Sequence, residues 1–332
     1  MYSLLRTALF KLEPERAHAL ALSAAQLAYR AGALSKGARQ SQPTTVMGLH
    51  FANRIGLAAG FDKNGRYVDA LGALGFGCIE VGTVTPRAQS GQPLPRLFRV
   101  PQAQALINRM GFPNDGADAV APRLARRRFK GVCGVNIGKN ATTPNERAID
   151  DYVSCFRVVA PVADYVAVNV SSPNTRDLRD LQQVDQLQPI LEALLAERDG
   201  LNAASGRRVP MLVKISPDIA RDELASVASL ASRLGIDGVI ATNTTVTRPA
   251  LHCAVATEQG GLSGAPLRLL ALDAVRTLRS VLASQVAIVG VGGIASPQDA
   301  TAMRAAGADL LQIYTGMIYR GPALIGQLSA VS

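Results

Sequence analysis

The sequence has little that could build a metal centre or a disulfide framework. In 332 residues it has four cysteines and three histidines. The cysteines show no CxxC or other metal-ligand spacing and the histidines are scattered, so we predict no metal. Reduced cysteines that pack in the interior are the simpler interpretation, and they indicate a reducing compartment. The residues are Cys78, Cys133, Cys155, Cys253, His18, His50 and His252.

Aromatic and acidic residues are also scarce. Tryptophan is absent, aromatic residues make up 5% of the chain and hydrophobic residues 48%, which predicts an aliphatic interior and excludes a disordered chain. The net charge is +10, with the densest basic run at Arg126–Arg128 and Lys130, where a solvated helix end is expected. Because no aromatic side chains interleave with the basic ones, we predict no nucleic-acid partner. A membrane surface and an anionic substrate remain compatible with this charge.

Long uncharged apolar runs are missing too. No stretch of ~20 such residues occurs and the N-terminus has no apolar signal core, so we expect no transmembrane helix and no secretory leader. Residues 1–42 instead predict two short amphipathic helices separated by Pro14, with six basic and two acidic side chains. Such helices either cap the core or anchor the chain at a membrane interface. From the pattern alone we favour the core-capping interpretation.

From residue 55 onward, short aliphatic runs alternate with helical patterns. This alternation predicts eight buried parallel strands, and eight evenly continued units favour a closed (β/α)8 barrel, the TIM barrel, over a doubly wound open sheet. We therefore predict an extension over residues 1–42 and a barrel over residues 43–332, with a hairpin at Val46–Asn53 closing the barrel bottom. The predicted strands are Ile55–Ala59, Cys78–Val81, Val132–Ile137, Tyr165–Val170, Met211–Ile215, Gly238–Ala241, Val286–Val289 and Leu310–Ile313.

Every predicted strand delivers a glycine or a hydrogen-bonding residue at or just after its carboxyl end. In such barrels the chemistry lies at the carboxyl ends of the strands. Glycine-rich turns follow the last two strands, at Gly290–Gly293 and Tyr314–Gly316, which is the usual phosphate site of this fold. Gly260–Gly264 would supply a third wall. The pattern therefore predicts a phosphorylated ligand, and flavin mononucleotide (FMN) fits best.

Lysines and asparagines complete the predicted rim. Lys63 and Lys214 lie at strand ends, where a lysine is either a Schiff-base nucleophile, as in an aldolase, or a fixed positive charge. The amides supply paired donors and acceptors, which suit a planar ring such as a flavin or a pyrimidine. These amides are Asn108, Asn136, Asn169, Asn174 and Asn243.

Several long motifs resemble the dihydroorotate dehydrogenases from end to end. They are Pro14–His18, Gly82–Pro86, Leu106–Phe112, Asn169–Thr175, Ile240–Thr245 and Gly260–Gly264. The resemblance implies FMN-dependent oxidation of dihydroorotate to orotate in pyrimidine (UMP) biosynthesis. Soluble members carry a cysteine base where this chain has Ser172, as the quinone-reducing, membrane-associated class does. That class also has an N-terminal helix pair, so the resemblance reverses our interpretation of residues 1–42 in favour of a membrane-facing quinone entrance.

The resemblance also implies a role for each matching residue. Ser172 would be the catalytic base, while Phe61 stands where some relatives have leucine. The implied quinone side is His18, Arg99 and Tyr314. The implied substrate residues are Lys63, Asn108, Arg109, Met110, Gly111, Phe112, Asn169, Asn174, Asn243 and Thr244. The implied FMN contacts are Ala59, Gly60, Phe61, Asp62, Lys63, Thr83, Asn136, Asn169, Lys214, Thr242, Gly264, Gly293, Tyr314 and Thr315.

The implied partners are dihydroorotate and orotate, one FMN per chain and a membrane quinone as electron-accepting co-substrate. We expect a monomer with no obligatory protein partner, in peripheral contact with anionic lipid on the cytoplasmic face of the inner membrane. Two other classes stay open. A barrel reductase that uses a nicotinamide would share the phosphate loops, and a non-enzymatic membrane protein would explain the basic helices but not the polar rim.

Overall fold

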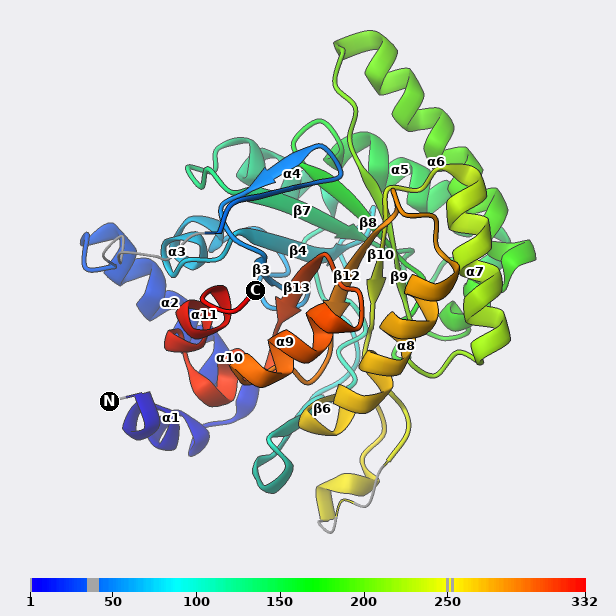
Figure 1. The fold of residues 1–332 in the computed structure, drawn as a ribbon. Helices are drawn as coiled ribbons and strands as arrows, with labels where there is room; N and C mark the ends of the chain where they lie inside the picture. Colours follow the sequence, from blue (N-terminus) through cyan, green and yellow to red (C-terminus); the bar gives the residue numbers. More distant parts are fainter. Residues whose placement is uncertain (1, 35–41, 249–250, 252–253) are drawn as a thin grey trace.

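The computed structural model describes residues 2–34, 42–248, 251 and 254–332 (Figure 1). Eight parallel strands close into a barrel, in the order β10-β12-β13-β3-β4-β7-β8-β9. Because β13 pairs with β3, the sheet has no free edge, and the predicted (β/α)8 barrel is confirmed over an open sheet. The strands are β3 (Ile55–Leu57), β4 (Cys78–Val84), β7 (Val132–Ile137), β8 (Tyr165–Asn169), β9 (Met211–Ile215), β10 (Gly238–Ala241), β12 (Ala287–Val291) and β13 (Leu310–Ile313).

The strands alternate between two buried surfaces. In β7, Cys133, Val135 and Ile137 pack in the cluster between the barrel and its helices, whereas Val132 packs in the barrel interior. Side chains of a strand point to opposite faces with a period of two, so Asn136 also points inward. The same alternation in β4 points Glu80 into the interior, where it is the one charged residue of that strand. The barrel therefore has an aliphatic outer layer and a partly polar interior.

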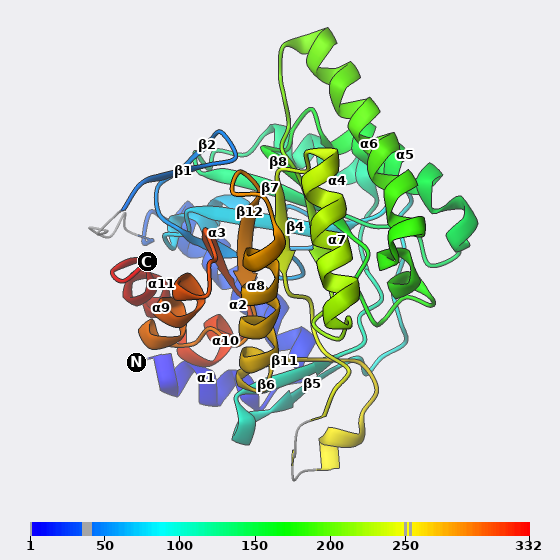
Figure 2. The same cartoon turned by 45° about the vertical axis from the view of Figure 1, so that its right-hand side comes forward.

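Helices ring the barrel, as Figures 1 and 2 show. The longest, α6, ends at Gly206, whose φ of 67° is left-handed and which therefore stops the helix. The ring comprises α3 (Val68–Ala73), α4 (Ala117–Ala125), α5 (Ala148–Val159), α6 (Val184–Ser205), α7 (Arg221–Leu234), α8 (Arg268–Val281), α9 (Pro297–Ala305), α10 (Thr315–Arg320) and α11 (Ala323–Ser329). Short 3-10 helices are η1 (Pro101–Ala103), η2 (Asn145–Arg147), η3 (Leu178–Gln182), η4 (Ala254–Thr257) and η5 (Ala265–Leu267).

The predicted hairpin is confirmed at the bottom of the barrel. Strands β1 (Thr44–Val46) and β2 (Leu49–Phe51) pair around Met47 and Gly48, whose φ angles of 55° and 75° are both positive, as a two-residue hairpin turn requires. Phe51 packs among interior residues at the start of the barrel strands. The hairpin therefore closes the end of the barrel opposite the carboxyl ends of the strands.

A second sheet was not predicted. Strands β5 (Leu97–Val100), β6 (Ala105–Asn108) and β11 (Gly261–Gly264) form an antiparallel sheet in the order β11-β6-β5, visible at the lower side of Figure 2. It joins the segment after β4 to the segment after β10. The sheet thereby brings Asn108 beside Gly261, to whose carbonyl its Nδ2 donates at 3.3 Å.

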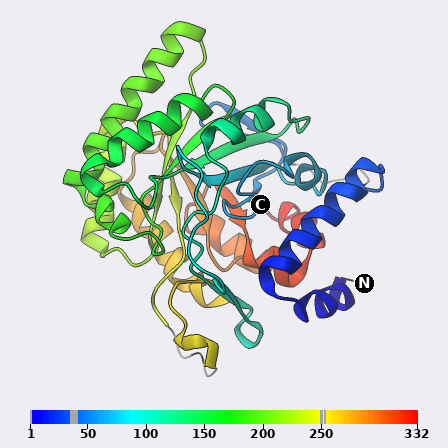
Figure 3. The ribbon, with the colours of Figure 1, turned by 180° about the vertical axis from the view of Figure 1, so that it is seen from behind.

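The two predicted N-terminal helices are α1 (Tyr2–Phe10) and α2 (Pro14–Arg30), which lie against one side of the barrel (Figure 3). The Glu13 carboxylate caps α2 by accepting hydrogen bonds from the backbone of Glu15 and Arg16. Helix α1 is fixed to α10, since the Tyr2 hydroxyl donates to the Ile318 carbonyl at 2.6 Å. The boundary predicted after residue 42 stays a prediction, because residues 35–41 lie outside the described residues.

Helix α2 has buried and exposed residues, whereas α1 has no buried residue. Ala17 and Leu22 of α2 are buried against the barrel side. Exposed leucines lie on both helices and, at Leu12, on the turn between them. No described helix has the length and apolar character to cross a bilayer. These leucines are Leu4, Leu5, Leu12, Leu20 and Leu27, which we call the leucine patch.

Candidate active site

A deep cavity of about 1100 Å³, counting the space that opens to solvent, lies at the carboxyl ends of the strands. Five of the eight barrel strands, β4, β8, β9, β12 and β13, contribute to its lining, together with β5, β6 and β11. Residues directly after β3 and β10 also line it. The structure brings most of the predicted site residues together here. Those that line it are Ala59, Gly60, Lys63, Thr83, Asn108, Met110, Gly111, Phe112, Asn169, Ser172, Asn174, Lys214, Thr242, Asn243, Thr244, Gly264, Gly293, Tyr314 and Thr315.

Four other predicted residues lie around the cavity rather than on its wall. The Asp62 carboxylate accepts hydrogen bonds from the backbone of Asn64, Arg66 and Tyr67, so it shapes the loop after β3. Arg109 pairs with Glu258 at 2.6 Å. Asn136 lies behind the wall, and Phe61 packs between α2 and Tyr314. Ser263, Val291, Gly292 and Gly316 also line the wall, within the glycine-rich turns predicted to hold a phosphate, as do Gly82 and Leu106 within motifs of the resemblance. No site role was predicted for the remaining wall residues, which are Ala58, Leu97, Pro113, Leu267, Ile294, Gln312 and Ile313.

The phosphate end of the cavity is lined by backbone. Gly264 and Gly293 have φ angles of 95° and 70°, which L side chains rarely adopt. A Cβ on Gly264 would lie 2.3 Å from the Gln104 carbonyl oxygen, and one on Gly316 would lie 2.2 Å from that of Ile294. Only glycine fits these positions, so the backbone itself forms a cradle where the turn motifs predict a phosphate.

Two residues in the floor of the cavity, Lys214 and Gln312, lie on a buried carboxylate that is not itself part of the wall. Glu80 is fully buried and accepts hydrogen bonds from Asn136 Nδ2, Tyr165 Oη and Gln312 Nε2 at 2.9, 2.9 and 2.7 Å. Burial, with the Glu80 charge beside it, raises the pKa of Tyr165 well above its usual value, so its hydroxyl acts as a donor. Lys214 Nζ lies 3.5 Å from Glu80 Oε1. Lys214 therefore presents a fixed positive charge to the cavity.

One side-chain oxygen in the floor of the cavity, Gln312 Oε1, can still accept a hydrogen bond. Gln312 lines the cavity, and its Oε1 is buried without a hydrogen-bond partner among the described residues. A buried amide oxygen without a partner costs about 1–3 kcal/mol, so it is suited to accept from a ligand N–H. This acceptor, the positive charge of Lys214 and the glycine cradle together fit a flat heterocycle that carries a phosphate.

The side-chain amides hydrogen-bond one another in two groups around the cavity, which together we call the amide network. Asn169 Nδ2 donates to Thr83 Oγ1 and to Asn136 Oδ1, both at 3.0 Å. Asn243 Nδ2 donates to Asn169 Oδ1 at 3.3 Å, which links the ends of β8 and β10. Asn174 Nδ2 donates to Asn108 Oδ1 at 3.1 Å. The network holds these amides in place, so their remaining donors and acceptors are oriented before a ligand arrives.

Ser172 lies in the loop after β8, almost fully buried. Its Oγ accepts one long hydrogen bond, from the Asn174 backbone N–H at 3.3 Å. Lys63 lies across the cavity and donates to the Gly60 carbonyl at 2.8 Å. Burial lowers the pKa of Lys63 to about 8, which leaves it mostly charged near neutral pH. The cavity therefore contains a hydroxyl group, side-chain amides and a lysine cation that can pair with the carboxylate of a ligand.

The predicted quinone residues connect the helices to the cavity. His18 Nε2 lies 2.8 Å from the Phe61 carbonyl oxygen, and its ring meets the Phe61 ring edge-on at 4.9 Å. Phe61 in turn packs on Tyr314, which lines the cavity. Arg99 lies at the α1–α2 elbow, where it donates to the Leu12 carbonyl at 2.8 Å and covers the Phe10 ring. A continuous aromatic contact thus runs from α2 to the cavity wall.

The burial of His18 predicts a change of stability with pH. Burial, then the nearby Lys63 charge, lowers the pKa of His18 from 6.5 to about 4. Between these values the unfolded chain binds a proton that the folded chain does not, so stability falls as pH drops from about 6.5 to 4, by up to about 3 kcal/mol. The free energy of unfolding of a His18→Gln variant, measured with urea, should not show this part of the decrease at acidic pH. The exposed His50 is the control, and parallel pH curves for His18→Gln and wild type would contradict the prediction.

A closed (β/α)8 barrel whose strand ends carry a glycine cradle, a fixed cation and an amide network has the features of an enzyme, with a cradle typical of phosphate sites. Residues 42–330 match the dihydroorotate dehydrogenase family. A dihydroorotate dehydrogenase (quinone) of Stenotrophomonas maltophilia (strain K279a) is 52% identical over 331 residues, covering 98% of this chain and 94% of that protein. One of Bordetella avium (strain 197N) is 52% identical, covering 98% and 95%.

A solved structure shares the same fold. The DHODH of Eimeria tenella in complex with ferulenol superposes with a TM-score of 0.89 at 38% identity, covering 96% of this chain and 90% of that one. The chain therefore belongs to the dihydroorotate dehydrogenase family, and the relatives it resembles are of the quinone-dependent type.

Proposed function

We propose that this chain oxidises dihydroorotate to orotate in pyrimidine biosynthesis and delivers the electrons to a quinone, with FMN as its resident cofactor. The observation that carries the proposal is the single cavity that joins the glycine cradle and the Lys214 floor to the amide network around Ser172. The family membership supplies the reaction. The cavity supplies a place for a phosphorylated flavin and, beside it, a place for a small cyclic amide with a carboxylate.

The residues around the cradle would hold FMN. Gly264, Gly293 and Thr315 would surround its phosphate, and Gln312 and Lys214 would meet its ring. When bound, FMN supplies the hydride acceptor for the C6 hydrogen of dihydroorotate. Lys214 would supply positive charge to the reduced flavin, and a preorganised cation stabilises developing negative charge more than water does. Glu80 keeps the Lys214 ammonium in place.

The residues around Ser172 would bind dihydroorotate and take its C5 proton. Asn108, Asn174 and Asn243 would hydrogen-bond the ring amides, and Lys63 would meet the carboxylate. Ser172 Oγ would accept the proton as the general base. A free hydroxyl is a weak base near neutrality, so the proton must pass onward as the transition state forms. We therefore expect a rate that keeps rising into the alkaline range.

The leucine patch supports peripheral contact with a membrane that contains the quinone. Exposed leucines on α1 and α2 offer apolar area, and the chain has a net charge of +10 that attracts anionic lipid. From His18 of α2, ring contacts lead through Phe61 to Tyr314 at the cavity wall. We propose that quinone reaches the flavin along this side, while dihydroorotate occupies the side of Ser172.

Anaerobic addition of dihydroorotate to the purified full chain tests the proposal. The protein should be yellow as isolated, and its visible flavin band should bleach in a single turnover. A short-chain quinone should then restore the band. A protein that bleaches with a reduced nicotinamide and not with dihydroorotate would belong to the competing reductase class. A colourless protein that fails to bind added FMN would contradict the cofactor assignment.

A further inference from the structure

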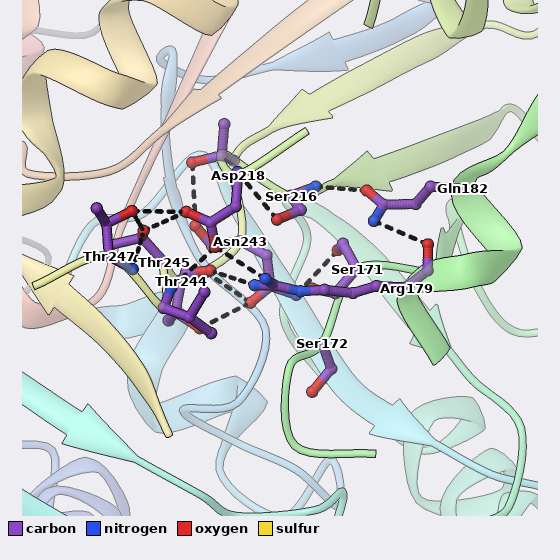
Figure 4. Close-up of polar contacts among 12 residues, drawn as sticks. Ser171, Ser172, Arg179, Gln182, Ser216, Asp218, Asn243, Thr244, Thr245 and Thr247 are labelled. Atoms are coloured by element: carbon purple, nitrogen blue, oxygen red, sulfur yellow. Dashed lines mark hydrogen bonds and ion pairs between the residues drawn. The ribbon is translucent and has the colours of Figure 1, made fainter. Parts of the chain in front are cut away.

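Arg179, in the 3-10 helix η3, joins three of the loops at the mouth of the barrel (Figure 4). Its Nε donates to the Ser171 carbonyl at 3.2 Å, and one Nη donates to the Thr244 carbonyl at 3.0 Å. The other Nη donates to Asp218 Oδ2 at 2.8 Å. These acceptors follow β8, β10 and β9, so one planar guanidinium connects three strand ends that are far apart in the sequence.

Asp218 completes the connection from the β9 side. Its Oδ2 also accepts from the Val246 backbone N–H at 2.8 Å, and its Oδ1 accepts from the hydroxyls of Thr245 and Thr247. The side chains of Arg179 and Asp218 are only 22% and 15% exposed, so solvent weakens their ion pair little. We call this pair, with its contacts to Ser171 and Thr244, the Arg179–Asp218 clamp.

Gln182 holds the same helix from its other end. Its Oε1 accepts from the Ser216 N–H at 2.7 Å, and its Nε2 donates to the Arg179 carbonyl at 3.3 Å. Ser216 Oγ then accepts from the Asp218 N–H at 3.1 Å. The backbone of η3 is therefore fixed to the loop after β9 independently of the guanidinium. A change at Arg179 should release the loop around Ser172 without detaching η3.

The position of Ser172 depends on its loop, because no side chain among those described hydrogen-bonds its hydroxyl. Its one recorded contact is the long bond from Asn174 N–H. The neighbouring Ser171, by contrast, is held on every polar atom. Its carbonyl accepts from Arg179 and its Oγ from Asn243 Nδ2 at 2.9 Å, while its N–H and Oγ donate to Asn169 Oδ1 at 3.2 and 3.1 Å. Asn243 Oδ1 also accepts from the Thr244 N–H, whose carbonyl Arg179 binds. The loop that carries Ser172 and the loop that carries Asn243 and Thr244 are thus hydrogen-bonded into one unit.

We propose that Arg179 and Asp218 are positioning residues for the proton-transfer step, because they hold the Ser172 loop in register with the substrate-binding residues Asn243 and Thr244. This inference rests on the proposed function. Neither residue lines the cavity or touches the reacting atoms. Their effect passes through the Ser171 carbonyl, directly before Ser172 in the chain. Misplacement of a reacting group by about 1 Å can cost about 10²-fold in rate.

The test compares Arg179→Ala, Arg179→Lys and Asp218→Asn with wild type in the full-length, FMN-loaded protein. We expect anaerobic flavin reduction by dihydroorotate to slow by about 10–10²-fold in Arg179→Ala, with a smaller loss in Arg179→Lys. The isotope effect for substrate deuterated at C5 should rise, because proton transfer becomes slower than the steps around it. Flavin content and reoxidation by quinone should not change. Amide hydrogen exchange across residues 170–178 should become faster.

Two further comparisons separate positioning from general destabilisation. Arg157→Ala breaks an ion pair of 2.6 Å with Glu197 on the outer helices and should alter none of these readouts. The double variant Arg179→Ala with Asp218→Asn should be no slower than the slower single variant, since the two residues act as one unit.

Two outcomes would overturn the clamp. One is an unchanged isotope effect in Arg179→Ala, with a rate that falls only in proportion to lost flavin. The other is fully additive losses in the double variant. Arg179→Lys keeps the charge and provides the same readouts if Arg179→Ala folds poorly. If dihydroorotate does not reduce the wild-type protein, the proposed function itself is wrong. If it reduces the wild type and the variants equally fast, only the positioning role is wrong.

Discussion

Ser172→Ala should slow the reduction of bound flavin by dihydroorotate by about 10²–10⁴-fold, the range that a positioned general base contributes. The variant removes the only hydroxyl that the resemblance assigns to the C5 proton and leaves the cavity otherwise intact. Because Ser172 Oγ accepts one long hydrogen bond, its loss should cost the fold little. Stopped-flow reduction without oxygen measures the effect directly, and orotate titration should show that ligand binding remains.

Ser172→Cys is the matched variant for that experiment. A thiol ionises more easily than a hydroxyl, so this variant should keep part of the activity. Its rate should level off at lower pH than that of the wild type, which should still climb. Reduction of Ser172→Ala at the wild-type rate would remove Ser172 from the mechanism.

Replacing Leu4, Leu5, Leu20 and Leu27 together by glutamate should abolish quinone reduction in anionic vesicles. The four side chains are 77%, 56%, 55% and 69% exposed, so the folded protein loses no core packing. Burial of one leucine in an apolar phase contributes about 1.5–3 kcal/mol, and the new charges add repulsion, so vesicle binding should weaken by at least about 10²-fold. Vesicle co-sedimentation and quinone turnover measure the two effects.

The control for the leucine patch is Leu269→Glu, which changes an equally exposed leucine, 73% exposed, on α8. It should leave vesicle binding unchanged. Single-turnover reduction by dihydroorotate should be normal in both variants, because the cavity lies elsewhere. Wild-type binding should also weaken with salt. Full vesicle activity in the fourfold variant would return α1 and α2 to a packing role alone. Substitution is preferable to truncation, since Tyr2, Ala17 and Leu22 pack on the rest of the chain.

The barrel was predictable because its strands are short aliphatic runs at even spacing. All eight predicted strands are present, and the main differences are at their ends. Strand β4 continues to Val84 through a register shift after Val81, where the sequence shows only a glycine and threonines. The antiparallel sheet of β5, β6 and β11 was missed because its three short strands come from two distant segments. Its pairing is a tertiary property that no local pattern carries.

The helices α1 and α2 show how pattern and structure differ. The pattern alone favoured a core-capping role, and the resemblance favoured a membrane role. The structure shows features of both, with Ala17 and Leu22 buried and the leucine patch exposed. Leucine spacing alone did not separate the two faces, because both faces of α2 carry apolar residues.

The cavity wall was largely predictable from residues at strand ends, whereas its supporting residues were not. Glu80 had a readable signal, since a carboxylate inside the run Cys78-Ile79-Glu80-Val81 must be buried and paired. The Arg179–Asp218 clamp had none, because its partners lie on loops that only the closed barrel brings together. Arg179 and Asp218 look like ordinary surface charges in the sequence.

The floor of the barrel has a consequence for how such sequences diverge. Removal of one member of a buried ion pair leaves an uncompensated charge and costs about 3–5 kcal/mol, while joint replacement by packed neutral residues is close to neutral. Glu80 and Lys214 are such a pair, and Asn136, Tyr165 and Gln312 are arranged around the same carboxylate. An evolutionary intermediate in which only one member of the pair is substituted should fold poorly. Related sequences should therefore carry both Glu80 and Lys214, or have both positions substituted.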